Sequence, residues 1–248
     1  MFANQSRFAV RFDWGERGLE AIGPGSAVLV IVDVLSFCTS VDIATARGAV
    51  VMPYRWRDDT AVRFAADHQA ILASPQRTVG GYSLSPASLS TIPPETRLVL
   101  PSPNGATLSL AAASLGITVA ACLRNAPVVA RFVRSRGGPV GVVACGERWE
   151  DGSLRPAWED LVGAGAVISE LTGSRSPEAE AATDAFVGAK LELRERLHAC
   201  ASGRELIERG FASDVALAAA YAVSECVPQL TAGAFVPGQV APPGGGDT

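Results

Sequence analysis

The sequence has few residues of the kinds that build thiolate, histidine-based or nucleic-acid-binding sites. Its 248 residues include two histidines, His68 and His198, and five cysteines without a Cys-x-x-Cys pair. A zinc site, a disulfide framework and a histidine dyad are therefore not indicated, and we expect the thiols to be buried. The formal net charge of −4 argues against binding to nucleic acid or to a membrane surface.

Long apolar runs and a leader pattern are also missing. No stretch approaches the roughly 20 apolar residues that a membrane-spanning helix needs. The first residues, MFANQSRFAV, lack the basic-then-apolar order of a signal peptide. We therefore expect a cytoplasmic protein without membrane association.

The chain instead contains apolar strands that alternate with helices. The patterns predict strands over residues 27–34, 49–54, 97–101, 117–123 and 139–145, and helices over 39–48, 58–73, 106–116, 126–136 and 157–171. Thr39 or Ser40 is the expected cap of the first helix and Asp58 of the second. Such alternation indicates a three-layer α/β/α fold with a mostly parallel or mixed sheet.

The C-terminal portion reads as helix only from Ser176 onward, with a break at Gly203 and a cap at Ser213 or Asp214. We expect residues 1–236 to form one α/β unit, with two sub-domains, about 1–125 and 126–236, as an open alternative. Residues 237–248 are rich in Pro and Gly and are predicted to be disordered. The apolar faces after Ser176 suit either a homodimer or an intrachain core.

Polar residues end three of the predicted strands. Asp33 ends the first, Ser102-Pro103-Asn104-Gly105 the third, and Cys145-Gly146-Glu147 the fifth. Ligands of open α/β sheets bind beyond the carboxyl ends of the strands, so these residues are expected at one crevice. Each also has a structural interpretation: Asp33 as a turn cap, the Ser102–Gly105 segment as a simple turn, and Glu147 as a loop acid.

Taken together, these residues indicate metal-assisted phosphate chemistry. The loops that lead into helices, residues 36–40 and 102–107, are expected to bind an anion through Ser36, Thr39, Ser40, Ser102, Asn104 and Gly105. Four carboxylates are expected to hold Mg²⁺, namely Asp33, Glu147, Glu159 and Asp160. Asp33, Glu147 and Asp160 are the candidate catalytic residues. Glu159 and Asp160 would also stabilise a helix start without any catalytic role.

Other phosphatase schemes are not met by the sequence. A Cys-x5-Arg loop would need Arg where Ala44 and Asp151 stand, and an Asp-x-Asp nucleophile motif would need an acid in place of Leu35. A phosphate-binding Gly-x4-Gly-Lys-[Ser/Thr] loop is missing as well.

The ordered motifs resemble those of the 2-phosphosulfolactate phosphatases, the ComB-like family. The resembling segments are Asp33-Val34-Leu35-Ser36-Phe37-Cys38-Thr39-Ser40, GGYSLSPASL, Ser102-Pro103-Asn104-Gly105-Ala106, and Cys145-Gly146 followed by Glu159-Asp160 and Gly163-Ala164-Gly165, within residues 27–235. The resemblance implies a three-layer α/β fold and Mg²⁺-dependent hydrolysis of a small anionic phosphoester, 2-phosphosulfolactate, to sulfolactate and phosphate.

Two departures from the family pattern affect the anion site. Ser36 stands where the family has arginine, and the Gly-Glu-Arg element expected before GGYSLSP is replaced by ASPQRTVGG. We hypothesise that Arg148 or Arg155, in the loop after the fifth strand, binds the substrate and replaces the missing charge. The alternative function is a relative that binds a small anionic ligand without hydrolysing it.

Overall fold

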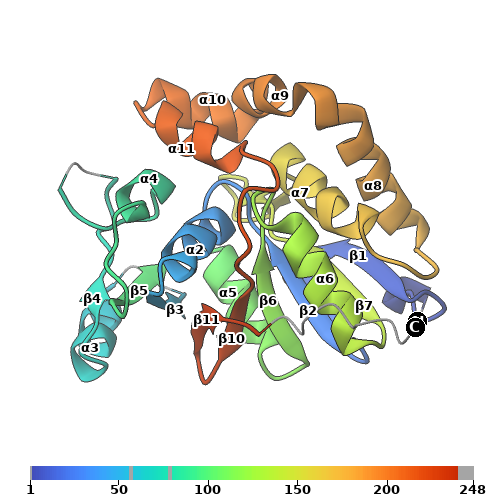
Figure 1. Ribbon diagram of the computed structural model, residues 1–248, viewed down its shortest axis with the longest axis horizontal. Coiled ribbons are helices and arrows are strands. Elements are labelled where there is room, and N and C mark those ends of the chain that lie inside the picture. Colours follow the sequence, from blue (N-terminus) through green and yellow to red (C-terminus); the bar gives the residue numbers. More distant parts are fainter. Residues whose placement is uncertain (1, 56–57, 78–79, 240–248) are drawn as a thin grey trace, which may run out of the picture.

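The computed structural model describes residues 2–55, 58–77 and 80–239, and the fold is built on a mixed sheet (Figure 1). Within the described residues, the sheet has the strand order β1-β7-β2-β6-β10-β11-β3-β5-β4. Its strands are β1 (Val10–Trp14), β2 (Val28–Val32), β3 (Val50–Tyr54), β4 (Ile71–Leu72), β5 (Arg97–Pro101), β6 (Ile117–Ala121), β7 (Val140–Ala144), β10 (Pro228–Thr231) and β11 (Ala234–Pro237).

The sheet consists of two parallel groups joined by a hairpin. Strands β1, β7, β2 and β6 run parallel to one another, and so do β3, β5 and β4. The β10–β11 hairpin lies between the groups and pairs antiparallel with β6 through Gln229 and with β3 through Phe235. The three antiparallel pairings reverse the direction of the second group relative to the first.

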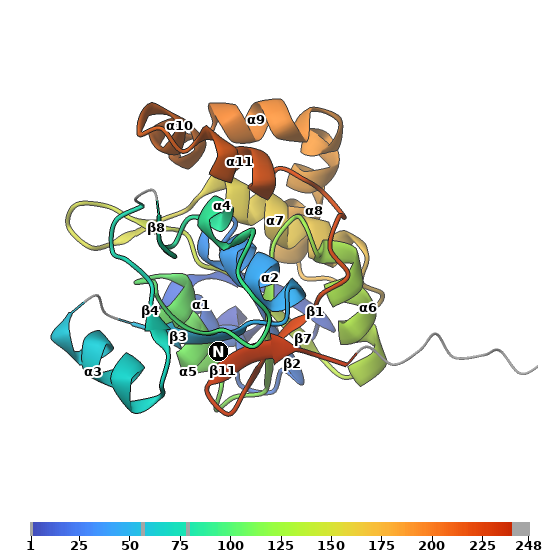
Figure 2. The same ribbon diagram turned by 60° about the vertical axis from the view of Figure 1, so that its left-hand side comes forward.

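Helices cover both faces of the sheet and the end of the first strand group. They are α1 (Gly15–Ile22), α2 (Phe37–Ala46), α3 (Asp59–Asp67), α4 (Pro86–Leu89), α5 (Gly105–Ala112), α6 (Ala126–Arg136), α7 (Trp158–Ser169), α8 (Pro177–Ala189), α9 (Leu193–Ala199), α10 (Ala201–Glu208) and α11 (Ala212–Ala218), with short 3-10 helices at Phe2–Asn4 and Lys190–Glu192. Helices α9, α10 and α11 form an arch above the sheet, seen at the top of Figures 1 and 2.

The core has two parts, one on each face of the sheet. Alternate residues of β2 contribute to different parts, because successive side chains of a strand point to opposite faces. Val28, Val30 and Val32 pack with residues of α6, α7 and α8, whereas Leu29 and Ile31 pack with residues of α1, α2 and α5. The predicted three-layer α/β/α fold with a mixed sheet is confirmed.

Several sequence-based boundaries were wrong for identifiable reasons. Helix α2 begins at Phe37, before Thr39, because the Asp33 carboxylate accepts the Phe37 N–H and starts the helix earlier. Helix α3 does keep the predicted Asp58 cap, but it ends at Asp67 because Ile71 and Leu72 pair with β5.

The C-terminal portion also differs from the prediction of helix only. Residues 228–237 form the β10–β11 hairpin, whose two-residue turn has positive φ at Ala232 and Gly233. The predicted break at Gly203 falls instead at Cys200, and α11 begins at Ala212 rather than behind a cap at Ser213 or Asp214.

The segment before β2 and the loop after β7 contain elements that the sequence did not predict, and part of the tail is not described. Strand β1 and helix α1 precede the first predicted strand, and the loop 146–156 contains a small hairpin, β8 (Glu147–Arg148) and β9 (Leu154–Arg155). Residues 240–248 of the tail predicted to be disordered lie outside the described residues. None of the helices in the described part of the chain is both long enough and apolar enough to cross a bilayer.

Candidate active site

A polar cavity of about 270 Å³ lies where the segments after β2, β5 and β7 meet helix α10. Its lining combines three carboxylates with four arginines: Asp33, Glu147, Glu205, Arg77, Arg148, Arg155 and Arg209. Ser36, Ser102, Asn104 and Ser202 add further polar groups. The predicted convergence of polar strand ends is therefore present, although β5 belongs to the second strand group.

Asp33 follows the fully buried strand β2 and is held at the floor of this cavity. One carboxylate oxygen, Oδ1, accepts the N–H of Phe37 at 3.0 Å, and the side chain is 7% exposed. Gly105, the first residue of α5, packs against the other oxygen: a Cβ at this position would lie 2.8 Å from Asp33 Oδ2 and 2.3 Å from Phe37 Cδ1. A glycine is required here because α5 approaches Asp33 so closely.

Glu147 and Asn104 form a hydrogen-bonded wall of the cavity. Asn104 Nδ2 donates to Glu147 Oε2 at 3.1 Å, and Asn104 Oδ1 accepts from Arg148 Nε at 3.3 Å. Arg148 also donates to Glu16 Oε1 at 3.0 Å. The β8–β9 hairpin positions both Glu147 and Arg148, so a short structured element replaces the loop that the sequence predicted.

Asp160 lies behind the cavity and ties two strand ends together. Val34 N donates to its Oδ1 at 2.7 Å and Gly146 N donates to its Oδ2 at 2.8 Å. The side chain is 3% exposed and lies in the first turn of α7. Both oxygens thus hold the backbone beside Asp33 and Glu147, which makes Asp160 a positioning residue.

The buried carboxyl groups raise one another's pKa values. Burial, with a contribution from Glu159, raises the pKa of Asp33 to about 6. Burial, with contributions from Asp33 and Glu159, raises the pKa of Glu147 to about 8, whereas Arg155 acts in the opposite direction. The pKa of Asp160 is also raised by burial and by the charges of Asp33 and Glu159. Burial therefore disfavours the ionised forms of these carboxyl groups, and a bound cation would favour them again.

Glu159 is 2% exposed and lies beside Cys200 rather than in the cavity lining. Burial, with the neighbouring Glu159 charge, raises the pKa of Cys200 to about 12, so this thiol is not a reactive thiolate. Cys38, Cys122 and Cys145 are buried, as expected, and Cys200 and Cys226 are partly buried.

Three residues predicted to bind the anion do not line the cavity, namely Thr39, Ser40 and Gly105. Thr39 is fully buried and donates to Val34 O at 2.7 Å, and Ser40 is fully buried and donates to Leu84 O at 3.1 Å. These hydroxyls satisfy carbonyl groups around α2 and lie under the site. The prediction that they contact substrate was wrong, because the first turn of α2 starts two residues earlier than expected.

Three of the backbone N–H groups at the two helix starts are already in use. Phe37 N bonds Asp33 Oδ1, Cys38 N bonds Asp33 O at 2.8 Å, and Gly105 N bonds Ser102 Oγ at 3.2 Å. The guanidinium groups that line the cavity are therefore better candidates to receive an anion than these three N–H groups.

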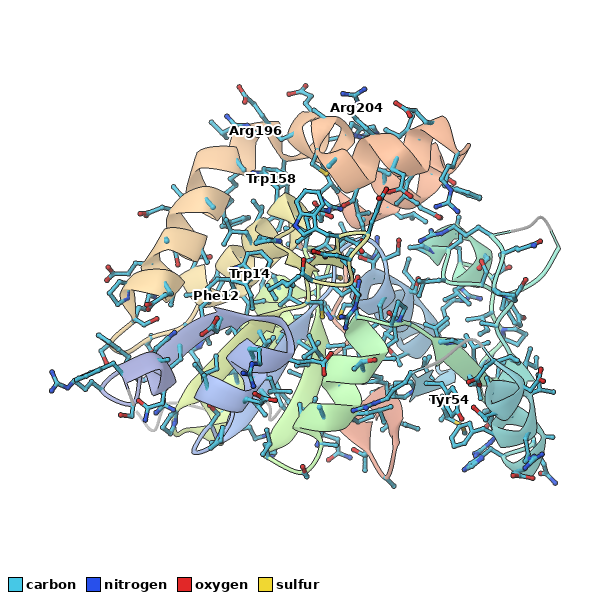
Figure 3. All side chains as sticks on the ribbon, turned by 180° about the vertical axis from the view of Figure 1, so that it is seen from behind. Phe12, Trp14, Tyr54, Trp158, Arg196 and Arg204 are labelled. Atoms are coloured by element: carbon cyan, nitrogen blue, oxygen red, sulfur yellow. The ribbon has the colours of Figure 1, made fainter. Side chains whose placement is uncertain are left out.

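Sequence reasoning missed the residues that reach the cavity from distant segments. Arg77 comes from the segment between β4 and α4, and Ser202, Glu205 and Arg209 come from α10 and its end. Figure 3 shows Arg204 projecting outward from the arch and Trp158 lying beneath it, so α10 has an outer and an inner face. A cluster of polar residues at spacings of three and four in residues 202–209 was the available signal.

The donor set fits a hard divalent cation. In the described part of the chain, no three Asp, Glu, His or Cys side chains form a ready-made metal cluster. Mg²⁺ usually takes one or two protein carboxylates and completes its shell with water and substrate phosphate. Asp33 and Glu147 are the two predicted metal ligands that line the cavity, and their mutual charge is what a cation would compensate.

Comparisons with known proteins agree with the resemblance. A curated protein of Gloeobacter violaceus (strain ATCC 29082 / PCC 7421), named probable 2-phosphosulfolactate phosphatase, is 32% identical over 116 residues. That match covers 47% of this chain and 48% of the relative, so it spans about half the length of each. A family model described as 2-phosphosulpholactate phosphatase matches residues 20–233, which include every residue that lines the cavity. The chain belongs to the 2-phosphosulpholactate phosphatase family.

Proposed function

We propose that this protein is a Mg²⁺-dependent phosphatase that hydrolyses 2-phosphosulfolactate to sulfolactate and phosphate. The observation that carries the proposal is the pairing, in one cavity, of carboxylates with raised pKa values and four arginines. A metal ion and a substrate with several acid groups would together balance these charges. Family membership supports the same reaction class.

Asp33 and Glu147 are the residues that would hold Mg²⁺. When bound, the ion would neutralise charge on the phosphoryl group and make phosphorus more open to attack. Asp33 is suited to this task because Phe37 N and the start of α5 fix its carboxylate. Asp160 supports both ligands by holding the backbone of Val34 and Gly146.

Glu147 is also suited to take the proton of the attacking water. A general base works best when its pKa lies near the working pH; the pKa of Glu147 is raised to about 8 in the metal-free protein, and a bound cation would lower it from there. Asn104 Nδ2 orients one oxygen, Oε2, which leaves Oε1 to face the cavity. As the water oxygen bonds to phosphorus, the ester P–O bond breaks, and the proton ends on the leaving oxygen as the hydroxyl of sulfolactate.

The arginines of the cavity would bind the acid groups of the substrate. Guanidinium groups form paired hydrogen bonds with phosphate, sulfonate and carboxylate oxygens. Arg148 and Arg155 lie on the β8–β9 hairpin and line the cavity, in keeping with the hypothesis that they contact substrate. We further propose, from composition alone, that the protein works in the cytoplasm.

Phosphate release from a panel of acidic phosphoesters, with Mg²⁺ or with EDTA, tests the proposal. We expect turnover of 2-phosphosulfolactate that depends on the metal and is lost in Asp33→Asn. Borohydride reduction during turnover is expected to leave Asp33 unchanged, because direct attack by water forms no acyl phosphate. Reduction of the Asp33 side chain to the alcohol would establish a covalent route instead, and no release from any ester would support the anion-binding alternative.

A further inference from the structure

Arg77 is the arginine of the cavity that pairs with a fully buried carboxylate. Its Nη1 donates to Asp214 Oδ2 at 2.5 Å, and its Nη2 donates to Ser36 Oγ at 2.9 Å. The Cζ atom also lies 5.6 Å from the centre of the Phe211 ring. The guanidinium group is thus fixed by residues from α11, from the start of α2 and from the residue before α11.

Asp214 is built to hold this arginine rather than to bind a ligand. It is fully buried, and its second oxygen, Oδ1, accepts from Ser85 Oγ at 2.6 Å and from Ala87 N at 3.0 Å. A buried carboxylate with every oxygen bonded keeps one orientation. The plane of the guanidinium group is therefore set before any ligand arrives.

Within the described residues, no other arginine of the cavity pairs with a buried carboxylate. Arg148 and Arg209 have side chains that are 45% and 57% exposed, and they pair with the exposed acids Glu16 and Glu205. Arg155 reaches Ser202 Oγ at 3.4 Å. The Arg77 side chain is 12% exposed. Since water and salt screen exposed charges more strongly, the charge of Arg77 is less screened by solvent than those of Arg148 and Arg209.

Donor groups remain for a ligand beside Arg77. An arginine has five N–H donors, and among the described residues Arg77 uses two of them. Ser36 Oγ accepts from Arg77, so its own hydrogen remains for another acceptor. The charge also reaches the reaction centre, because Arg77 acts to lower the pKa of Asp33 against the effect of burial.

We propose that Arg77 and Ser36 bind the sulfonate group of the substrate, with Asp214 as the positioning residue. The guanidinium and hydroxyl donors match the three oxygens of a sulfonate, while the phosphate occupies the side of Asp33 and Glu147. This inference rests on the proposed function and assigns the substrate specificity to Arg77, from the segment between β4 and α4, and to Ser36, at the start of α2.

Kinetics with two substrates test this assignment. One is 2-phosphosulfolactate, and the other is 2-phospholactate, which lacks the sulfonate. Arg77→Gln and Ser36→Ala are expected to raise KM for 2-phosphosulfolactate about 10- to 100-fold and to leave KM for 2-phospholactate within about threefold. The reason is that each variant loses a hydrogen bond to a charged group only when the substrate carries the sulfonate. Equal effects on both substrates, or none, would overturn the assignment.

Control variants separate binding from folding. Arg77→Lys keeps a positive charge beside the buried Asp214 but removes the paired N–H donors of the guanidinium group. It is expected to raise KM for 2-phosphosulfolactate selectively, but by a smaller factor. Arg204→Gln, on the outer face of α10 with a side chain 69% exposed, is expected to behave as the wild type. Urea unfolding of each variant shows whether the fold is kept.

A binding measurement distinguishes this inference from the proposed reaction. Calorimetric titration with sulfolactate needs no turnover, and Ser36→Ala is expected to weaken its binding about 10-fold or more. If the wild type releases no phosphate but binds sulfolactate through Arg77 and Ser36, the reaction is refuted and the sulfonate site stands. If the wild type hydrolyses the ester without this selectivity, the sulfonate site is refuted and the reaction stands.

Discussion

Replacement of Asp160 tests whether this carboxylate holds the site together. Its two oxygens accept the N–H groups of Val34 and Gly146, and both residues are buried. Asp160→Ala leaves two buried donors without partners, each of which costs about 1–3 kcal/mol. The free energy of unfolding is therefore expected to fall by about 2–6 kcal/mol, a large share of the roughly 5–15 kcal/mol of a typical domain.

Charge repulsion acts in the opposite direction, and Asp160→Asn separates the two effects. Both variants remove the repulsion from Asp33 and Glu159 that helps to raise the pKa of Asp160. Only asparagine keeps one acceptor oxygen, so its loss of stability is expected to be smaller, about 1–3 kcal/mol. Asp184→Asn, on the exposed side of α8, is the matched control and is expected to stay within about 0.5 kcal/mol.

Urea unfolding followed by tryptophan fluorescence measures these differences, and phosphate release measures their effect on the site. We expect kcat to fall in both variants, because the segments that carry Asp33 and Glu147 lose hydrogen bonds to the side chain that joins them. The reasoning is refuted if Asp160→Ala is as stable as the wild type, or if both variants are more stable than it. Equal stability would mean that the repulsion cancels the two hydrogen bonds, and a gain in stability would mean that it outweighs them.

Three further predictions concern close packing, pH and metal. Gly105→Ala is expected to lower the free energy of unfolding by about 1–3 kcal/mol and to abolish activity, because the new Cβ would overlap the buried Phe37 ring and crowd Asp33. The control Gly188→Ala, in α8 with open space around it, is expected to raise the free energy of unfolding by up to about 1 kcal/mol in the same urea assay. The pKa of Glu147 is raised from 4.5 to about 8, so the folded metal-free protein binds the extra proton, and its free energy of unfolding is expected to fall as pH rises between these values, by at most about 1.4 kcal/mol per pH unit for this group. Glu147→Gln should flatten that slope, and an unchanged slope would count against the assignment. Mg²⁺ binding at pH 7 is expected to release protons, which calorimetry detects as a binding heat that depends on the buffer; equal heats in all buffers would contradict this. EDTA is expected to stop phosphate release, and full activity in EDTA would contradict the metal dependence.

Local patterns were sufficient for the elements that bury a regular face. The run of residues 27–34 predicted the buried strand β2, and the predicted helix 126–136 has the bounds of α6. The β10–β11 hairpin was missed although Ala232 and Gly233 occupy a typical two-residue turn. Its strands are short and lie between two strand groups, so their state depends on pairing with β6 and β3 rather than on their own periodicity.

The residues of the candidate site were likewise predicted only in part. Asp33, Asn104 and Glu147 were predicted because each follows an apolar strand, and all three line the cavity. Thr39 and Ser40 were wrongly included, because the exact start of a helix depends on which side chain caps it. The sequence could not show that both oxygens of Asp160 are used by backbone N–H groups from two other segments.

The sequence by itself determined the α/β class, the family resemblance and the strand ends that carry acids, because these follow from short-range periodicity and from motifs in order. Only the tertiary structure decided which charges face the cavity. Arg77 reaches Ser36 across 41 positions and Asp214 across 137, and no local pattern records such contacts. They arise because packing of α10 and α11 above the strand ends brings buried polar groups together, where each must find a partner.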